Sequence, residues 1–290
     1  MIFRKFLSAL MFYTRIPVPH SCCDLNAAET APFLPLIGFL VGGISAGVWF
    51  AAALFLPHSV AVVMSMIVSV LLTGAFHEDG FADSCDGIYG GFTVHDRLRI
   101  MKDSRVGAYA LVGTVLLILL KYTLLREIPV SIFPVAVIMA QVLSRLVPVY
   151  LMRILRYVRE DGTSKIMAEI APGTEPMDGA GNGAVDGAGA GAVDGADNRA
   201  GNGAGIGKVS LPGIVGATLF STVLIAVLSY VSNSWYLLCV LIVVPVLTAL
   251  SARYFYRKLG GYTGDILGAS QQLAEAGVLA ALLVLWRYLP

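Results

Sequence analysis

Three aspartates in one short polar segment have the spacing of metal ligands carried by a helix. Asp79, Asp83 and Asp86 stand at i, i+4 and i+7 in the run FHEDGFADSCDG, which begins at Phe76. On a helix this spacing puts the three carboxylates on one face, within about one turn of each other. Carboxylates at that distance repel, and a divalent cation relieves the repulsion. Oxygen ligation indicates Mg²⁺ or Mn²⁺ rather than zinc.

The alternative is that these acids only solvate the end of a helix. That explanation is common for soluble proteins, but here the segment directly follows an apolar run in a chain that is poor in charge. Ionisable groups at the depth of a membrane usually serve a function. We therefore expect a site rather than a solvated helix end.

Cations follow the aspartates along the chain, in the run HDRLRIMKDSR that ends at Arg105. In one interpretation Lys102 and Arg105 bind lipid headgroups, as basic residues of an interfacial helix do. The more specific hypothesis joins them to the aspartates in a site for a phosphorylated substrate. A metal ion would then neutralise one side of a pyrophosphate and the cations the other.

A third polar cluster, GGYTGDILGA, stands near the C-terminus. Thr263 and Gly264 precede a predicted helix, and the backbone N–H groups of such a turn can hold phosphate. Glycine-rich turns are often only turns, so the motif is weak alone. The predicted membrane topology strengthens it, because it puts Asp265 on the same membrane face as Asp79 and Asp83.

The composition of the chain is that of an integral membrane protein. Of its 290 residues, 57% are hydrophobic and 13% are charged, whereas soluble domains carry about 25% charged residues. A helical span needs about 20 mostly apolar residues. Such runs cover residues 33–56, 59–76, 107–125, 131–152, 211–231, 235–252 and 266–286. They predict an all-α polytopic membrane bundle of about seven helices, with one membrane domain over residues 1–290.

Lysine and arginine alternate between the connections of these spans. The N-terminal segment and the third, fifth and seventh connections are basic, whereas the connections near Pro57 and at 232–234 have no such residue. The positive-inside rule then places the N-terminus and the aspartate segment on the cytoplasmic face of the cell membrane. Residues 173–207 are rich in Gly, Ala and Asp, which predicts a disordered cytoplasmic insertion. The net charge of +1 argues against a nucleic-acid partner.

Five ordered motifs, FYTRIPVP, LPLIGFLVGG, FHEDGFADSCDG, MKDSRVGAYA and GGYTGDILGA, belong to a longer stretch of similarity to one family, from about Phe6 to Leu283. Together they resemble the cobalamin synthase family, the adenosylcobinamide-GDP ribazoletransferases. The resemblance leaves out only the 173–207 stretch. It implies a Mg²⁺-dependent transferase at the cytoplasmic membrane that completes the assembly of adenosylcobalamin. Such enzymes join adenosylcobinamide-GDP to α-ribazole or its 5′-phosphate and release GMP.

The resemblance also implies roles for individual residues. Asp79, Asp83 and Asp86 would hold Mg²⁺ on the pyrophosphate, and one acid, with His77 and Glu78 as rival candidates, would take the proton of the attacking ribose hydroxyl. Members of the family often have a glutamate where this chain has Gln272, so the site has one ligand fewer if that glutamate binds metal. The predicted set is catalytic Asp83, His77 and Glu78; substrate-binding Lys102, Arg105, Thr263 and Gly264; and metal-binding Asp79, Asp83, Asp86, Asp265 and Glu275.

Two other functions compete with this one. Asp83, Asp86 and Gly87 match the start of the D-x-x-D-G-x-x-A-R pattern of CDP-alcohol phosphotransferases, which make phospholipids, but the A-R pair is absent. Lys121 and Arg145 lie in apolar runs and could line the path of a transporter. The chain shows no inverted repeat and no acid at the middle of a predicted span, which disfavours transport. A homo-oligomer is a further option that the residues do not decide.

Overall fold

Helices make up the fold in the computed structural model of this chain, which describes residues 2–19, 27–159 and 208–289. The elements, with short 3-10 helices marked η, are α1 Ile2–Tyr13, α2 Ala27–Thr30, η2 Ala31–Phe33, α3 Leu34–Ala53, α4 His58–Thr73, α5 Phe76–Gly90, α6 Val94–Ile100, α7 Ala108–Glu127, α8 Phe133–Ser144, α9 Leu146–Ile154, α11 Leu211–Val231, η3 Trp235–Ile242, α12 Val243–Leu259 and α13 Gly264–Tyr288. The predicted insertion at 173–207 lies outside the described residues.

Six of the described helical segments are long and apolar enough to cross a membrane, and the number is seven if one bent pair forms a single span. The six are Ala27–Ala53, Ala108–Glu127, Phe133–Ile154, Leu211–Val231, Trp235–Leu259 and Gly264–Tyr288. Helices satisfy their own backbone hydrogen bonds, which lipid cannot do for them. The prediction of a helical membrane bundle with about seven spans is confirmed.

The bent pair is α4 and α5, and here the structure departs from the predicted span 59–76. α4 ends at Thr73, and the two residues that follow, Gly74 (φ 66°) and Ala75 (φ 60°), have left-handed backbone. Such a conformation does not continue a right-handed helix, and the axis of α5 is bent by 87° from that of α4. The aspartate segment is therefore a helix of its own, bent away from α4, rather than a straight continuation of it.

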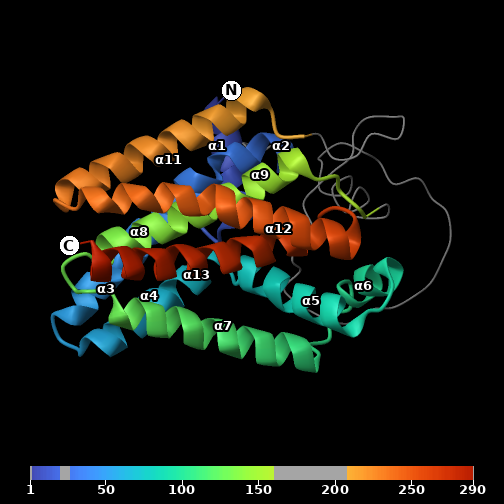
Figure 1. Cartoon of the computed structure of the whole chain (residues 1–290), viewed down its shortest axis with the longest axis horizontal. Coiled ribbons are helices and arrows are strands. Elements are labelled where there is room, and N and C mark those ends of the chain that lie inside the picture. The colour runs from blue at the N-terminus through green and yellow to red at the C-terminus, as the bar shows by residue number, and fades with distance from the viewer. Residues whose placement is uncertain (1, 20–26, 160–207, 290) are drawn as a thin grey trace.

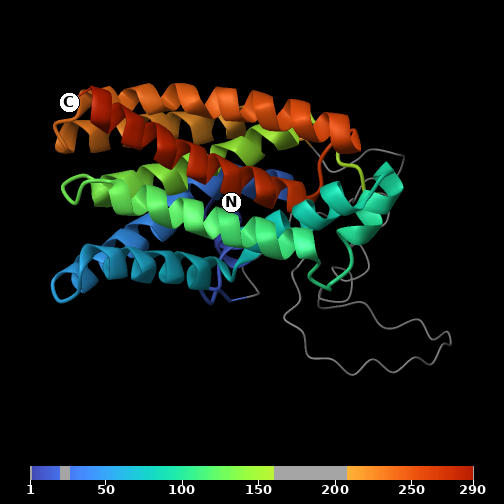
Figure 2. The ribbon, with the colours of Figure 1, turned by 60° about the horizontal axis from the view of Figure 1, so that its bottom comes forward.

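The long helices lie side by side along the longest axis of the molecule (Figure 1). α8, α9 and α13 form much of the interior, since 83% of the apolar part of Phe133–Ile154 is buried against only 17% of that of α7. Figures 1 and 2 both show α5 and α6 at one end of the bundle, with the start of α13 beside α5. The α3–α4 and α7–α8 connections and the C-terminus lie at the opposite end. The fold thus brings two polar segments, far apart in sequence, to the same end.

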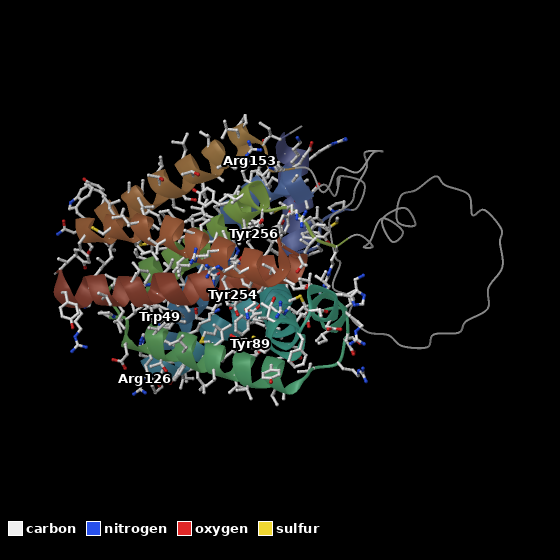
Figure 3. The ribbon with its side chains drawn as sticks, turned by 45° about the vertical axis from the view of Figure 1, so that its right-hand side comes forward. Trp49, Tyr89, Arg126, Arg153, Tyr254 and Tyr256 are labelled. Carbon is white, nitrogen blue, oxygen red and sulfur yellow. The ribbon has the colours of Figure 1, made fainter. Side chains whose placement is uncertain are left out.

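The two ends of the bundle differ in charge as the loop pattern predicts. The end with α6 carries Arg97, Arg99 and Lys102, whereas the connections 54–57 and 232–234, at the opposite end, have no lysine or arginine. Arg126 is a single cation at the end of α7 that is remote from α5 (Figure 3). The basic connections are therefore concentrated at the end formed by α5, α6 and the start of α13.

Candidate active site

The crossing of α5 and α13 is close enough to bring the two backbones into contact. A Cβ atom on Gly80 of α5 would lie 2.9 Å from the carbonyl oxygen of Asp265 and 3.0 Å from its Cα atom. A Cβ atom on Gly268 of α13 would lie 3.1 Å from the carbonyl oxygen of His77. Small residues allow membrane helices to approach in this way. The crossing places the aspartates of α5 beside the first turn of α13.

Asp83 is half-buried at this crossing, with other carboxylates around it. The charges of Asp265, Asp79 and Asp86 all act on it, and Arg159 is the opposing cation. Two predicted groups that are separated by about 180 residues in sequence thus meet in space. Like charges held close together favour a bound cation, which agrees with the chemistry expected from their spacing.

Arg159 joins this site although sequence reasoning counted it only as one cation of a basic connection. Its Nη2 atom lies 2.6 Å from Oδ2 of Asp265, and both residues are buried. A buried charge needs such a partner. Thr263, a predicted substrate contact, is also buried, and its Oγ1 atom accepts a 3.3 Å hydrogen bond from the backbone N–H of Ile266 as the N-cap of α13. Gly264, the other predicted contact in this turn, is exposed.

Asp86 holds α7 to α5. Its Oδ2 atom accepts a 2.6 Å hydrogen bond from the backbone N–H of Gly107, and its Oδ1 atom accepts a 2.9 Å bond from that of Ala110. These donors belong to the first turn of α7, whose N–H groups have no partner inside the helix. A carboxylate there also complements the helix dipole. The structure thus gives Asp86 a capping function, and any metal ion would have to share oxygens that α7 already orients.

Lys102 and Arg105 are exposed in the connection between α6 and α7. The guanidinium of Arg105 binds the carboxylate of Asp103, with an Nη2–Oδ2 distance of 2.6 Å. This contact lowers the pKa of Asp103 to about 2. α6 packs against α5, so the connection lies at the aspartate end of the bundle. Arg105 therefore has an acidic neighbour that a phosphate group would have to displace.

Glu275 lies elsewhere, in the interior of the bundle. It is ten residues beyond Asp265 on α13, a separation of about 15 Å along the helix. Its Oε1 atom is 2.8 Å from Nζ of Lys121 and accepts a 2.9 Å hydrogen bond from Gln141. The geometry does not support its predicted place among the metal ligands around Asp83. It also corrects the expectation that no acid lies midway along a span.

The two rival candidates for the base, His77 and Glu78, also face the interior. His77 is 4% exposed, and neither ring nitrogen has a hydrogen-bond partner among the described residues. The Oε1 atom of Glu78 accepts a 2.9 Å hydrogen bond from Nε2 of Gln272. Gln272, which sequence reasoning considered as a replaced metal ligand, thus bonds to Glu78 and lies away from the aspartates. Of the three predicted catalytic residues, Asp83 is the one placed among the other aspartates.

The side chains of the aspartate cluster are of the right chemical type to bind a metal ion, but they do not lie close enough together to bind one. Asp79, Asp83 and Asp265 supply the oxygen ligands that Mg²⁺ prefers, and the charges of Asp79 and Asp265 both act on Asp83. Within residues 2–19, 27–159 and 208–289, however, no three acidic, histidine or cysteine side chains come close enough to hold one ion. Side-chain rotation of the aspartates would be needed to assemble such a set.

Comparison with known proteins covers nearly the whole chain. A family described as cobalamin-5-phosphate synthase matches residues 5–179 and 193–283. A Shewanella amazonensis protein named adenosylcobinamide-GDP ribazoletransferase is 38% identical over 288 residues, which are 97% of this chain and 95% of that protein. A Shewanella frigidimarina protein of the same name is 37% identical over 278 residues, 93% of this chain and 90% of its own. No solved structure matches. Since the family match spans the α5 aspartates, the α6–α7 connection and the first turn of α13, the chain belongs to the cobalamin-5-phosphate synthase family.

Proposed function

We propose that this chain is an adenosylcobinamide-GDP ribazoletransferase, a membrane enzyme of cobalamin biosynthesis. The substrates are adenosylcobinamide-GDP and α-ribazole or its 5′-phosphate. One observation carries the proposal: in a chain of this family, the crossing of α5 and α13 puts Asp83 beside Asp265 and Arg159. Acids and a cation together suit a reaction at a pyrophosphate, where negative charge must be neutralised and a hydroxyl activated.

The reaction is a phosphoryl-type transfer. The hydroxyl oxygen of the α-ribazole ribose attacks the phosphorus atom that carries the cobinamide. A new P–O bond forms, the P–O bond to GMP breaks, and GMP leaves with the electron pair of that bond. The proton of the hydroxyl passes to a carboxylate. We assign this task to Asp83, because it is half-buried at the crossing, whereas Glu78 and His77 face the bundle interior.

The remaining charges orient the pyrophosphate. Asp79, Asp83 and Asp265 are the residues that would hold Mg²⁺, which when bound supplies positive charge to the phosphate oxygens. Arg159 fixes the carboxylate of Asp265 through their 2.6 Å ion pair. Lys102 and Arg105 meet the leaving phosphate from the α6–α7 connection. Such charge neutralisation and positioning account for most of the catalysis in phosphoryl transfer.

We further propose that the end with α5 and α6 faces the cytoplasm at the cell membrane. The basic residues of that end support this orientation, because positively charged connections are retained on the cytoplasmic side. Adenosylcobinamide-GDP and α-ribazole 5′-phosphate carry charged phosphate groups, so with this orientation both would reach Asp83 from the cytoplasm.

The direct test uses the purified protein in lipid nanodiscs with Mg²⁺, adenosylcobinamide-GDP and α-ribazole 5′-phosphate. We expect GMP and the joined corrinoid nucleotide to appear in a one-to-one ratio. A protein that releases no GMP, but turns over a CDP-linked lipid or transports a solute into vesicles, would show that the proposal is wrong.

A further inference from the structure

A network of buried polar side chains crosses the interior of the membrane domain, apart from the aspartates around Asp83. Its members come from α5, α7, α8, α13 and the α8–α9 junction, and the proposed reaction uses none of them. We call it the intramembrane network, and its residues are Glu78, Lys121, Gln141, Arg145, Gln272 and Glu275. Ionisable groups at this depth are costly and are usually retained for a function.

Gln272 is the link between the network and the aspartate helix. Its Nε2 atom donates a 2.9 Å hydrogen bond to Oε1 of Glu78, and its Oε1 atom accepts a 3.0 Å bond from Nζ of Lys121. The amide group of glutamine can donate and accept at the same time, so Gln272 connects an anion on one side with a cation on the other. Lys121 is 7% exposed and Gln272 is 2% exposed.

Lys121 anchors this link from α7, where it is one of the few buried residues of a mostly exposed helix. Its ammonium has three donors and uses them on two residues of α13, Gln272 at 3.0 Å and Glu275 at 2.8 Å. Behind them, Gln141 donates to Glu275 at 2.9 Å, and Arg145 donates to the backbone carbonyl of Gln141 at 2.8 Å. The two acids and two cations balance, which lowers the cost of burying them.

A small cavity lies beside the network, next to a carboxylate oxygen of Glu78 that has no hydrogen-bond partner among the described residues. The cavity is ≈ 40 Å³ in volume, and Ser45, Glu78, Lys121 and Gln272 contribute to its lining. The Oε2 atom of Glu78 and the hydroxyl of Ser45 are buried without a partner in the described part of the chain. A cavity of this size has room for about three water molecules, which would complete the hydrogen bonds of Glu78 on a wall that is otherwise mostly apolar.

We propose that Lys121 is a positioning residue for the transfer reaction. It holds Gln272, Gln272 holds Glu78, and Glu78 fixes the first turn of α5. This inference rests on the proposed function. The turn leads directly to Asp79 and, one turn later, to Asp83. The Gly80 crossing makes their placement sensitive, because α5 has no free space in which to shift against Asp265.

The main test asks whether Lys121 positions α5 through Gln272 and Glu78, or only forms a structural ion pair with Glu275. Gln272→Met removes the link to Glu78 but leaves the pair of Lys121 with Glu275. We expect kcat for GMP release to fall about 10- to 100-fold, the range seen when groups that orient a site are lost. The KM values of both substrates should stay within about threefold, because no substrate contact changes. Gln271→Met is the matched control, since Gln271 is buried and bonds to Ser144 and Glu275 but not to Glu78; its kcat should stay near that of the wild type.

Two further variants examine Lys121 itself. Lys121→Met leaves Glu275 as an unpaired buried acid, so the protein can fail to fold. The double variant Lys121→Met/Glu275→Gln removes both charges and should recover the thermal stability of the wild type, while kcat stays as low as in Gln272→Met. Lys121→Arg keeps a cationic donor and should retain more kcat than the double variant.

Each result supports or overturns the inference. If the wild type releases no GMP, the proposed function is wrong and the inference falls with it. If the wild type is active and Gln272→Met keeps its kcat, or if the double variant recovers both stability and kcat, the network only joins helices and Lys121 is not a positioning residue.

Discussion

Two polar regions of this membrane protein contain acids, and their charge balance differs. Around Asp83, three other aspartates act on one carboxylate and Arg159 opposes them. In the intramembrane network, by contrast, Glu78 and Glu275 are matched by Lys121 and Arg145. An excess of like charge is unfavourable unless a cation or a charged ligand enters, whereas a balanced set is complete without one. The first arrangement suits a reaction site, and the second suits a support that holds it.

A substitution of Asp83 gives the strongest test of this difference between the aspartates and the intramembrane network. Asp83→Asn keeps the size of the side chain but removes the base and the negative charge. We expect kcat to fall by about 10²- to 10⁴-fold, the usual contribution of a general base, with insertion into the membrane intact. GMP release measures kcat, and recovery of the protein in the membrane fraction measures insertion. Glu127→Gln, an exposed acid at the opposite end of α7, is the control, and equal activities of the two variants would remove Asp83 from the site.

The crossing of α5 and α13 gives the next largest effect. In Gly80→Ala the new Cβ atom would lie within 3.0 Å of the Asp265 backbone, so the helices must separate. Overpacking of this kind costs about 1–3 kcal/mol, and it also moves Asp83 away from Asp265. We expect a lower unfolding temperature and a marked loss of GMP release. Gly43→Ala is the control, because a Cβ atom there meets no described atom within 4 Å; a similar loss in both variants would speak against the crossing.

Asp86 distinguishes a metal ligand from a helix cap. If it only caps α7, Asp86→Ala should lower the free energy of unfolding by about 1 kcal/mol, as the loss of an N-cap does. Its kcat should fall far less than that of Asp83→Asn. Chemical unfolding and GMP release, measured side by side, decide the question. An activity as low as that of Asp83→Asn would make Asp86 a ligand after all.

The smallest effect concerns the exposed pair of Arg105 and Asp103. The folded-state pKa of Asp103 is lowered to about 2, so the contribution of the pair is present above the unfolded pKa of about 4 and is lost as the pH falls through 2. At neutral pH we therefore expect Asp103→Asn to leave the unfolding temperature nearly unchanged, since exposed pairs contribute little.

The KM of adenosylcobinamide-GDP tests the proposed contact between Arg105 and phosphate, independently of stability. If Arg105 meets phosphate, Asp103→Asn should slightly lower the KM of adenosylcobinamide-GDP, and Arg105→Ala should raise it. Steady-state kinetics at constant ionic strength measure both changes. Equal KM values for the two variants and the wild type would exclude Arg105 from the substrate site.

The sequence predicted what depends on local spacing. A helix through Asp79, Asp83 and Asp86 follows from their positions, and the apolar runs predict the bundle. The break between α4 and α5 was missed, although Gly74 marks the place, because an alanine rarely adopts left-handed backbone and Ala75 therefore gives no signal in the sequence. Sequence spacing also predicted that Asp86 binds metal together with Asp79 and Asp83. In the structure its carboxylate instead accepts hydrogen bonds from the backbone at the start of α7.

The residues that sequence reasoning missed are those whose partners lie far along the chain. Arg159 stood among several cations of one connection, and only the fold shows that it pairs with Asp265. Lys121 and Arg145 were noticed as charges in apolar runs, but their link through Gln272 to Glu78 depends on how four helices pack. Gly80 and Gly268 carried a signal that could have been used, since small residues mark close helix crossings in membranes.

The most direct measurement compares the two acidic regions by divalent-cation binding. Mn²⁺ can replace Mg²⁺ at oxygen ligands and is followed by electron paramagnetic resonance in the wild type, in Asp83→Asn and in Lys121→Met/Glu275→Gln. We predict that Asp83→Asn loses the bound Mn²⁺, whereas the double variant binds it as the wild type does. Binding that survives in Asp83→Asn and disappears in the double variant would place the metal in the intramembrane network and contradict the assignment of the active site to α5 and the start of α13.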